Sequence, residues 1–169
     1  MLKSIVSKCI LTFSSLILVS NEAFTETKLG LDNFKINPQS HIEFSSDSMT
    51  LSKKSGQANF FDNVLVKYGQ LKLSAQKLII LQSKSGKEFK HLVFSASGPI
   101  IISNENNFIY GDEAKFVSEK QELTIIGNVK LNQKNNVITG DKLILNLQSG
   151  IARISGTVRT IIDTSGTLE

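Results

Sequence analysis

Hydrophobic and polar residues alternate along most of the chain after residue 37. In "LTIIGNVKL", residues 123–131, every second position is apolar or Gly and falls on one face. A period of two is typical of a half-buried β-strand. The segment "ANFFDNVLV", residues 58–66, repeats the pattern, and no sustained apolar period of 3.6 follows residue 23. We therefore expect an all-β chain with almost no helix.

Two short motifs recur four times. The first is a small residue followed by Asp or Gln, at Ser46-Asp47, Ala75-Gln76, Gly111-Asp112 and Gly140-Asp141. The second begins at Asp62, Gly98, Gly127 and Gly156 and ends in Val or Ile two positions later. The second follows the first by 16 residues in three copies (62−46, 127−111, 156−140) and by 23 in the other (98−75). An insertion of seven residues around "SKSGKEF" explains the longer spacing, and the four copies indicate an internal repeat.

The apolar pattern changes face at the first motif. Apolar residues lie two positions before and three after the small residue, as Ile109 and Ala114 do around Gly111. A spacing of five reverses the inward parity, so a bulge or sharp bend must intervene. We expect Asp47, Asp112 and Asp141 to have a structural role at these corners, because Asp readily bonds nearby backbone.

Three all-β architectures are compatible with such units: an antiparallel β-jellyroll or flattened sandwich, a parallel β-solenoid, and a closed up-and-down barrel. Polar turns such as "SKKSGQ" and "SEKQE" favour antiparallel connections. A membrane barrel would need more residues and an aromatic girdle. Each unit leaves one apolar face uncovered, so the copies must stack.

The first 23 residues have the layout of a secretory signal peptide. Lys3 and Lys8 flank the start of the apolar run "CILTFSSLILV", and cleavage is expected near Ala23, with a retained anchor as the alternative. Cys9 is the only cysteine, so the mature chain has no disulfide or thiolate chemistry. We expect a flexible N-terminal segment at 24–37, one domain at 38–162 and a short tail at 163–169.

Charge and composition disfavour several functions. Beyond residue 23 there are 17 Lys and Arg (19 minus 2) and 14 Asp and Glu (15 minus 1), a net charge of +3. The basic residues alternate with apolar ones, which is typical of a solvated strand face, and no basic cluster supports nucleic-acid binding. His41 and His91 lie 50 residues apart and we expect both at the surface. No nucleophile and base set is visible, so we expect no enzyme, metal or cofactor.

The ordered series "SD…DNV…GQLKLSAQKL…GPI…GD…GNV…GDKLILNLQSG" resembles the OstA-like domain family of lipopolysaccharide-transport proteins over roughly residues 38–160. LptA, LptC and the N-terminal part of LptD share this domain, and the short apolar leader favours the periplasmic, LptA-like type. The resemblance implies a V-folded, boat-shaped antiparallel β-jellyroll. It also implies an apolar groove for lipopolysaccharide acyl chains.

The resemblance further implies a bridge in the periplasm. Protomers would join end to end through edge strands and carry lipopolysaccharide from the inner-membrane export complex to the outer membrane. The expected partners are lipopolysaccharide, LptC-like and LptD-like OstA domains, and further copies of the chain. Two alternatives stay open: a membrane-anchored LptC-like component, and an exported structural β-sandwich with a closed interior.

Under this interpretation the groove and the edges can be assigned to residues. The groove is expected at the inward positions Ile42, Phe44, Met49, Leu51, Phe60, Val64, Ile100, Ile102, Phe116, Ile125, Val129 and Leu143. The edge-strand interfaces are expected at His41, Ile42, Glu43, Phe44, Ile151, Ile154 and Val158. The alternative for the groove residues is an ordinary closed core. Asp62 stands where the other copies have Gly, and parity turns it inward unless a bulge intervenes.

Overall fold

The computed structural model describes residues 31–37, 39–85 and 88–162, which form a short 3₁₀ turn and ten strands. The turn is η1 (Leu31–Phe34). The strands are β1 (Ile42–Ser45), β2 (Ser48–Ser52), β3 (Gln57–Tyr68), β4 (Leu71–Ser85), β5 (Glu88–Asn104), β6 (Asn107–Val117), β7 (Glu122–Gln133), β8 (Asn136–Asn146), β9 (Ala152–Ser155) and β10 (Arg159–Ile161). None of the helical structure in these ranges is long and apolar enough to cross a membrane. The signal peptide expected at residues 1–23 lies outside the described residues.

All strands belong to one antiparallel sheet that does not close on itself. Its order is β1-β3-β4-β5-β6-β7-β8-β10, while β2 also pairs with β3 and β9 also pairs with β8. Every strand pair in the described residues is antiparallel and the strand order does not return to its start, so the sheet is neither the parallel solenoid nor the closed barrel considered above. The prediction of an all-β antiparallel jellyroll is confirmed.

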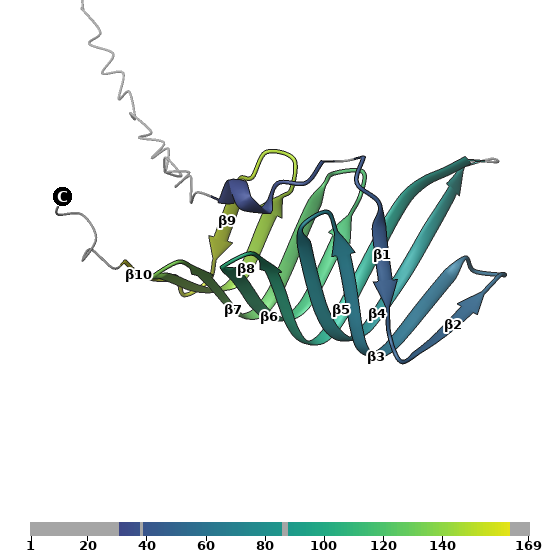
Figure 1. The fold of residues 1–169 in the computed structure, drawn as a ribbon, viewed down its shortest axis with the longest axis horizontal. Coiled ribbons are helices and arrows are strands. Elements are labelled where there is room, and N and C mark those ends of the chain that lie inside the picture. The colour runs from purple at the N-terminus through teal and green to yellow at the C-terminus, as the bar shows by residue number, and fades with distance from the viewer. Residues whose placement is uncertain (1–30, 38, 86–87, 163–169) are drawn as a thin grey trace, which may run out of the picture.

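The long strands bend near their middles, and the sheet doubles over into two facing layers (Figure 1). Each ladder from β3 to β8 shifts register at the bend, for example between Phe61 and Val64 and between Ile126 and Val129. The other three shifts at the bend lie between Ser74 and Lys77, Ser97 and Ile100, and Tyr110 and Glu113. These sites are the repeated motifs. The change of parity seen in the sequence occurs there in β4, β6 and β8, while β3, β5 and β7 each carry one extra, bulged residue and keep their period of two.

Hydrogen bonds join the two motifs of a copy across neighbouring strands. Asn63 Nδ2 donates to Asp47 Oδ2 at 2.7 Å, and Asn128 Nδ2 donates to Asp112 Oδ2 at 2.8 Å. In the last copy the backbone N–H of Thr157 donates to Asp141 Oδ2 at 3.2 Å. All three pairs are 16 residues apart. The recurring spacing of 16 residues therefore sets the cross-strand register, in which the carboxylate of the first motif lies beside the second motif of the same copy.

Glycine begins the second motif because the backbone there is left-handed and crowded. Gly127 has a φ of +79°, and a Cβ built on it would overlap Asp112 Oδ2. Gly156 has a φ of +97°, and a Cβ built on it would overlap Asp141 Oδ2 in the same way. Asp62 takes this position in the first copy with a φ of +58° and is exposed. The bulge thus turns Asp62 away from the interior.

The core lies between the two layers and includes residues that precede the sheet. Its most completely buried side chains include Leu78, Ile109, Ile125, Leu131, Leu143 and Leu145. Leu31, Phe34 and Ile36 join this cluster, although we expected residues 24–37 to form a flexible segment ahead of the domain. The packed domain therefore extends at least to Leu31.

Replacing Gly127 with Ala should destabilise the fold more than the same change at Gly56. Both residues have positive φ, but a Cβ at Gly56 meets only Gln82 O, at 3.5 Å. We expect a loss in the free energy of unfolding of about 2–4 kcal/mol for Gly127→Ala and about 1–2 kcal/mol for Gly56→Ala, because only the former adds overlap to dihedral strain. Urea unfolding monitored by circular dichroism measures both values. Equal losses would show that the contact with Asp112 does not constrain the corner.

Candidate functional site

The apolar interior contains a hollow between the two layers. Its empty space amounts to about 490 Å³, part of which is open to solvent. One layer contributes Val66, Tyr68, Leu71, Leu73 and Ile102, and the other contributes Leu78, Phe94, Ala96, Ala114, Phe116 and Leu123. Ile36 and Leu147 complete the lining. Because these side chains are almost entirely hydrocarbon, the hollow suits an apolar ligand.

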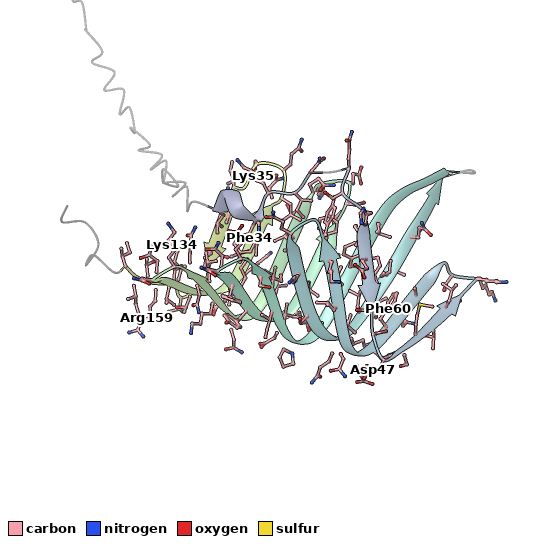
Figure 2. All side chains as sticks on the ribbon, viewed as in Figure 1. Phe34, Lys35, Asp47, Phe60, Lys134 and Arg159 are labelled. Atoms are coloured by element: carbon pink, nitrogen blue, oxygen red, sulfur yellow. The ribbon has the colours of Figure 1, made fainter. Side chains whose placement is uncertain are left out.

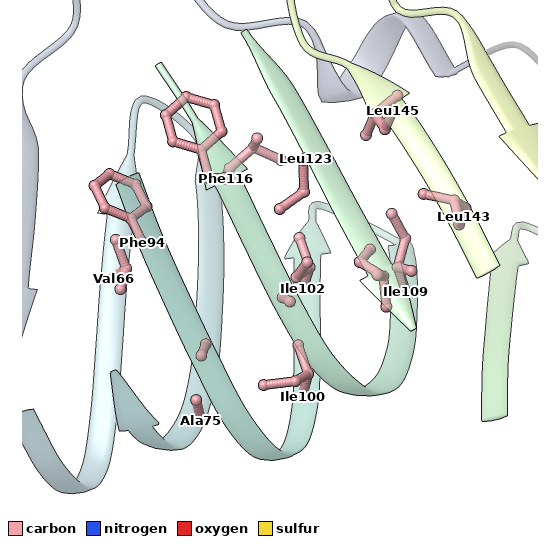
Figure 3. Packing of buried hydrophobic residues seen from close by; sticks show 14 of the residues in the cluster. Val66, Ala75, Phe94, Ile100, Ile102, Ile109, Phe116, Leu123, Leu143 and Leu145 are labelled. Atoms are coloured by element: carbon pink, nitrogen blue, oxygen red, sulfur yellow. The ribbon is translucent and has the colours of Figure 1, made fainter. Parts of the chain in front are cut away.

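Aromatic rings connect the two layers beside the hollow. Phe44 on β1 lies 5.6 Å, centroid to centroid, from both Phe60 and Phe94. Phe94 stacks on Phe116 at 5.0 Å, and Phe116 meets the edge of Tyr68 at 6.2 Å. Figure 3 shows Phe94 and Phe116 side by side on adjacent strands. Such ring pairs stabilise a fold by more than the burial of their surface alone. They therefore help to hold the two layers together beside the hollow.

Tyr68 brings the one polar side-chain group among the lining residues. Burial raises the pKa of the Tyr68 phenol above its ordinary value of 10.0, because the charged phenolate is poorly solvated there. The phenol is therefore neutral at physiological pH. Among the described residues no carboxylate or ammonium group lines the hollow, so the walls that they form carry no charge.

The structure places the predicted groove residues at three levels of exposure. Of the twelve, Ile102 and Phe116 line the hollow. Buried elsewhere in the interior are Phe60, Val64, Ile100, Ile125, Val129 and Leu143. Ile42 and Phe44 are partly buried against the core. The interior is thus hollow in one stretch and filled by side chains in another.

Met49 and Leu51 share the inward face but are exposed. Met49 pairs with Phe60 and Leu51 pairs with Ala58, so their side chains continue the apolar surface of β3. Their exposed fractions are 54% and 63%, because β2 has no neighbour on its other side in the described residues. The apolar interior therefore runs out to this edge of the sheet.

Sequence reasoning did not select several lining residues, among them Tyr68, Leu73, Phe94 and Leu123. Leu73 and Leu78 occupy recurring apolar positions two before and three after the small residue of the second copy. Phe94 and Ala96 alternate with polar Ser95 and Ser97, which is the period of two. That alternation identifies an inward face, but it does not tell which inward residues border a hollow.

The predicted interface residues lie at the two edges of the sheet. Ile42, Glu43 and Phe44 form most of β1, and His41 precedes it. At the other edge Ile154 belongs to β9, while Ile151 and Val158 precede β9 and β10. Glu43 forms an ion pair with Lys67 of the neighbouring strand, at 3.3 Å. Ile154 packs against the core, whereas Ile151 and Val158 are exposed.

The described residues contain no cluster of three or more His, Cys, Asp and Glu side chains that could hold a metal ion. His41 is exposed, and the side chain of His91 lies outside the part that the structure describes. The corner residues Asp47, Asp112 and Asp141 accept the hydrogen bonds given above, as expected for a structural role. Figure 2 labels Asp47 at the bend, on the outside of the fold.

Comparisons with known proteins identify similar chains. Residues 43–151 match a protein family described as LptA/(LptD N-terminal domain) LPS transport protein. An uncharacterized protein of Rickettsia prowazekii, RP507, is 24% identical over 106 residues, which are 62% of this chain and 73% of that protein. The crystal structure of LptH from Pseudomonas aeruginosa, described as the LptA-homologous periplasmic component of the lipopolysaccharide transport device, superposes with a TM-score of 0.65. That match covers 75% of this chain and 97% of LptH at 20% identity.

Proposed function

Because the chain belongs to the LptA/LptD N-terminal domain family of lipopolysaccharide-transport proteins, we propose that it binds lipopolysaccharide with the acyl chains in the hollow between its two layers. In this proposal the protein acts in the periplasm as one component of a bridge from the inner-membrane export complex to the outer membrane. It supplies a path for the lipid, and transport is driven from elsewhere.

The observation that carries the proposal is an apolar hollow with uncharged walls inside an open sheet. An acyl chain that enters it leaves water, which stabilises the complex by roughly 0.8 kcal/mol for each buried methylene. The phosphate and sugar groups of the lipid would stay outside, because burying charge without a partner is costly. A groove of this kind needs no catalytic group.

The hollow also bears on the alternatives. A structural sandwich gains stability by filling its interior, since cavities reduce packing contacts. The open space lined by Leu73, Phe94 and Ile102 favours a ligand-binding interior over that alternative. A membrane-anchored LptC-like role depends on residues 1–23, and detection of the uncleaved N-terminus in a membrane fraction would support it.

The two edges support association between OstA-like domains. β1 and β2 at one edge, and β9 and β10 at the other, each pair with a single strand in the described residues. Unpaired strand edges can accept a strand from another chain, which is β-augmentation. Exposed apolar residues lie at both edges, including Leu51 at one and Ile161 at the other. We propose that copies of the chain, and LptC-like and LptD-like domains, join through these edges.

A photo-crosslinking amino acid tests whether acyl chains enter the interior. Placed at Ile102 or Phe116, it should capture lipopolysaccharide in cells, because both side chains line the hollow. Lys130 is the control, since it is exposed on the outer surface of β7 beside Tyr110. Immunoblots of the purified protein for attached lipopolysaccharide give the result. Adducts at Lys130 equal to those at Ile102, or none at the inward sites of a folded and exported protein, would contradict the proposal.

Charged substitutions test the end-to-end association. Leu51→Asp and Ile161→Asp should each reduce self-association at least ten-fold, because each places a carboxylate in a proposed edge interface. Both residues are more than 60% exposed, so the fold should be stable. Ile126→Asp is the matched control, since Ile126 is 47% exposed on a central strand. Sedimentation velocity measures the assemblies, and unchanged sizes for both edge variants would exclude these edges.

A further inference from the structure

Residues 31–37, which we call the strap, cross from one layer of the sheet to the other. The backbone N–H of Ile36 donates to the carbonyl of Leu147, at the end of β8, over 3.0 Å. The Ile36 side chain lies beside the β3–β4 turn, with Cγ2 3.9 Å from a Cβ built on Gly69. Leu147 and Gly69 belong to the rims of opposite layers. Figure 1 shows η1 of the strap above the sheet, next to β9.

The strap inserts apolar side chains into the interior. Leu31 and Phe34 are 1% and 0% exposed, and Ile36 is buried, whereas Lys35 and Asn37 face outward. All three buried side chains belong to the cluster that fills the space between the layers. Figure 2 labels Phe34 directly below η1. The strap therefore fills apolar space in the way that a bound hydrocarbon would.

The hollow that the strap borders is small for a lipid with several acyl chains. The figure of about 490 Å³ includes space that is open to solvent, so the enclosed part is smaller still. Ile36 forms part of its wall, and Phe34 and Leu31 are buried in the same core cluster. Acyl chains that fill the interior more fully must take the place of these side chains.

We propose that the strap is a displaceable plug, whose Leu31, Phe34 and Ile36 occupy the groove in the lipid-free protein and leave it when acyl chains bind. The inference rests on the proposed function, because it assumes that the interior accepts lipid. Strap and lipid then compete for one apolar space, and lipid shifts the protein toward the open state that it binds better. The apparent affinity for lipid equals the affinity of the open state multiplied by the fraction of molecules that are open, so a mostly closed strap weakens binding.

Weakening the strap should therefore strengthen lipid binding. Phe34→Ala removes the most deeply buried strap side chain, and we expect purified lipopolysaccharide to bind roughly three- to ten-fold more tightly, because the open fraction rises. Phe108→Ala is the matched control: Phe108 stacks on Tyr110 with ring centroids 6.4 Å apart, on the face opposite to Ile109. Phe108→Ala should bind as the wild type does. Unchanged or weaker binding by Phe34→Ala would overturn the plug.

Hydrogen exchange tests displacement in the unmodified protein, independently of whether Phe34→Ala folds. The Ile36 amide is hydrogen-bonded to Leu147 in the lipid-free state, so it should exchange faster at saturating lipopolysaccharide. The Ile138 amide, where β8 pairs with both β7 and β10, should keep its protection and serves as the internal reference. Slower exchange at Ile36 in the complex would make the strap a fixed wall of the binding site and would overturn the proposal.

A disulfide provides the opposite manipulation. Ile36→Cys with Leu147→Cys, in a chain carrying Cys9→Ser, joins two residues whose backbones are hydrogen-bonded and should hold the strap closed. Because both substitutions change the lining of the hollow, the two redox forms of this variant are compared with each other, and we expect the oxidised form to bind at least ten-fold more weakly than the reduced form. Equal binding by both forms would overturn the plug alone. Absence of lipopolysaccharide binding by wild type, reduced form and Phe34→Ala alike would instead overturn the proposed function.

Discussion

The bend at the repeated motifs in every long strand is the constraint on which the rest of the molecule depends. In β4, β6 and β8 the inward parity reverses at the bend, whereas β3, β5 and β7 keep their period of two and carry one extra, bulged residue there. Both halves of each strand can then direct apolar residues into the same space, as Ile109 and Ala114 do on either side of Gly111 and Asp112. One sheet thereby becomes two layers with a shared interior.

The corners are held by short-range polar contacts. The carboxylates of Asp47, Asp112 and Asp141 bind the next corner, and Gly127 and Gly156 leave room for two of them. The bend is therefore built into each repeat and does not depend on a separate layer packing from outside. The two ends of the sheet stay unpaired in the described residues, and apolar side chains such as Met49 reach one of them. An open, extendable interior follows from this arrangement.

Much of this architecture could be predicted from the sequence. The period of two predicted the strands, the spacing of 16 predicted the cross-strand register, and the parity change at the first motif predicted the bends. The depth of each inward residue could not be predicted, because alternation does not distinguish Ile102, which borders the hollow, from Leu143 in the filled interior. Met49 and Leu51 have the inward parity of buried residues, yet their exposure depends on what lies beyond β2. The strap was missed because "LDNFKI" is too short to show a period.

Methyl NMR of the isoleucine-labelled protein during titration with lipopolysaccharide tests the central claim, that lipid enters between the layers. Ile101 and Ile102 are neighbours on β5, but Ile101 is 41% exposed on the outer face and Ile102 is 1% exposed beside the hollow. The account predicts large shift changes or broadening at the Ile102 methyl groups, with little change at Ile101. Perturbation confined to Ile101 and Ile126 on the outer face would contradict it.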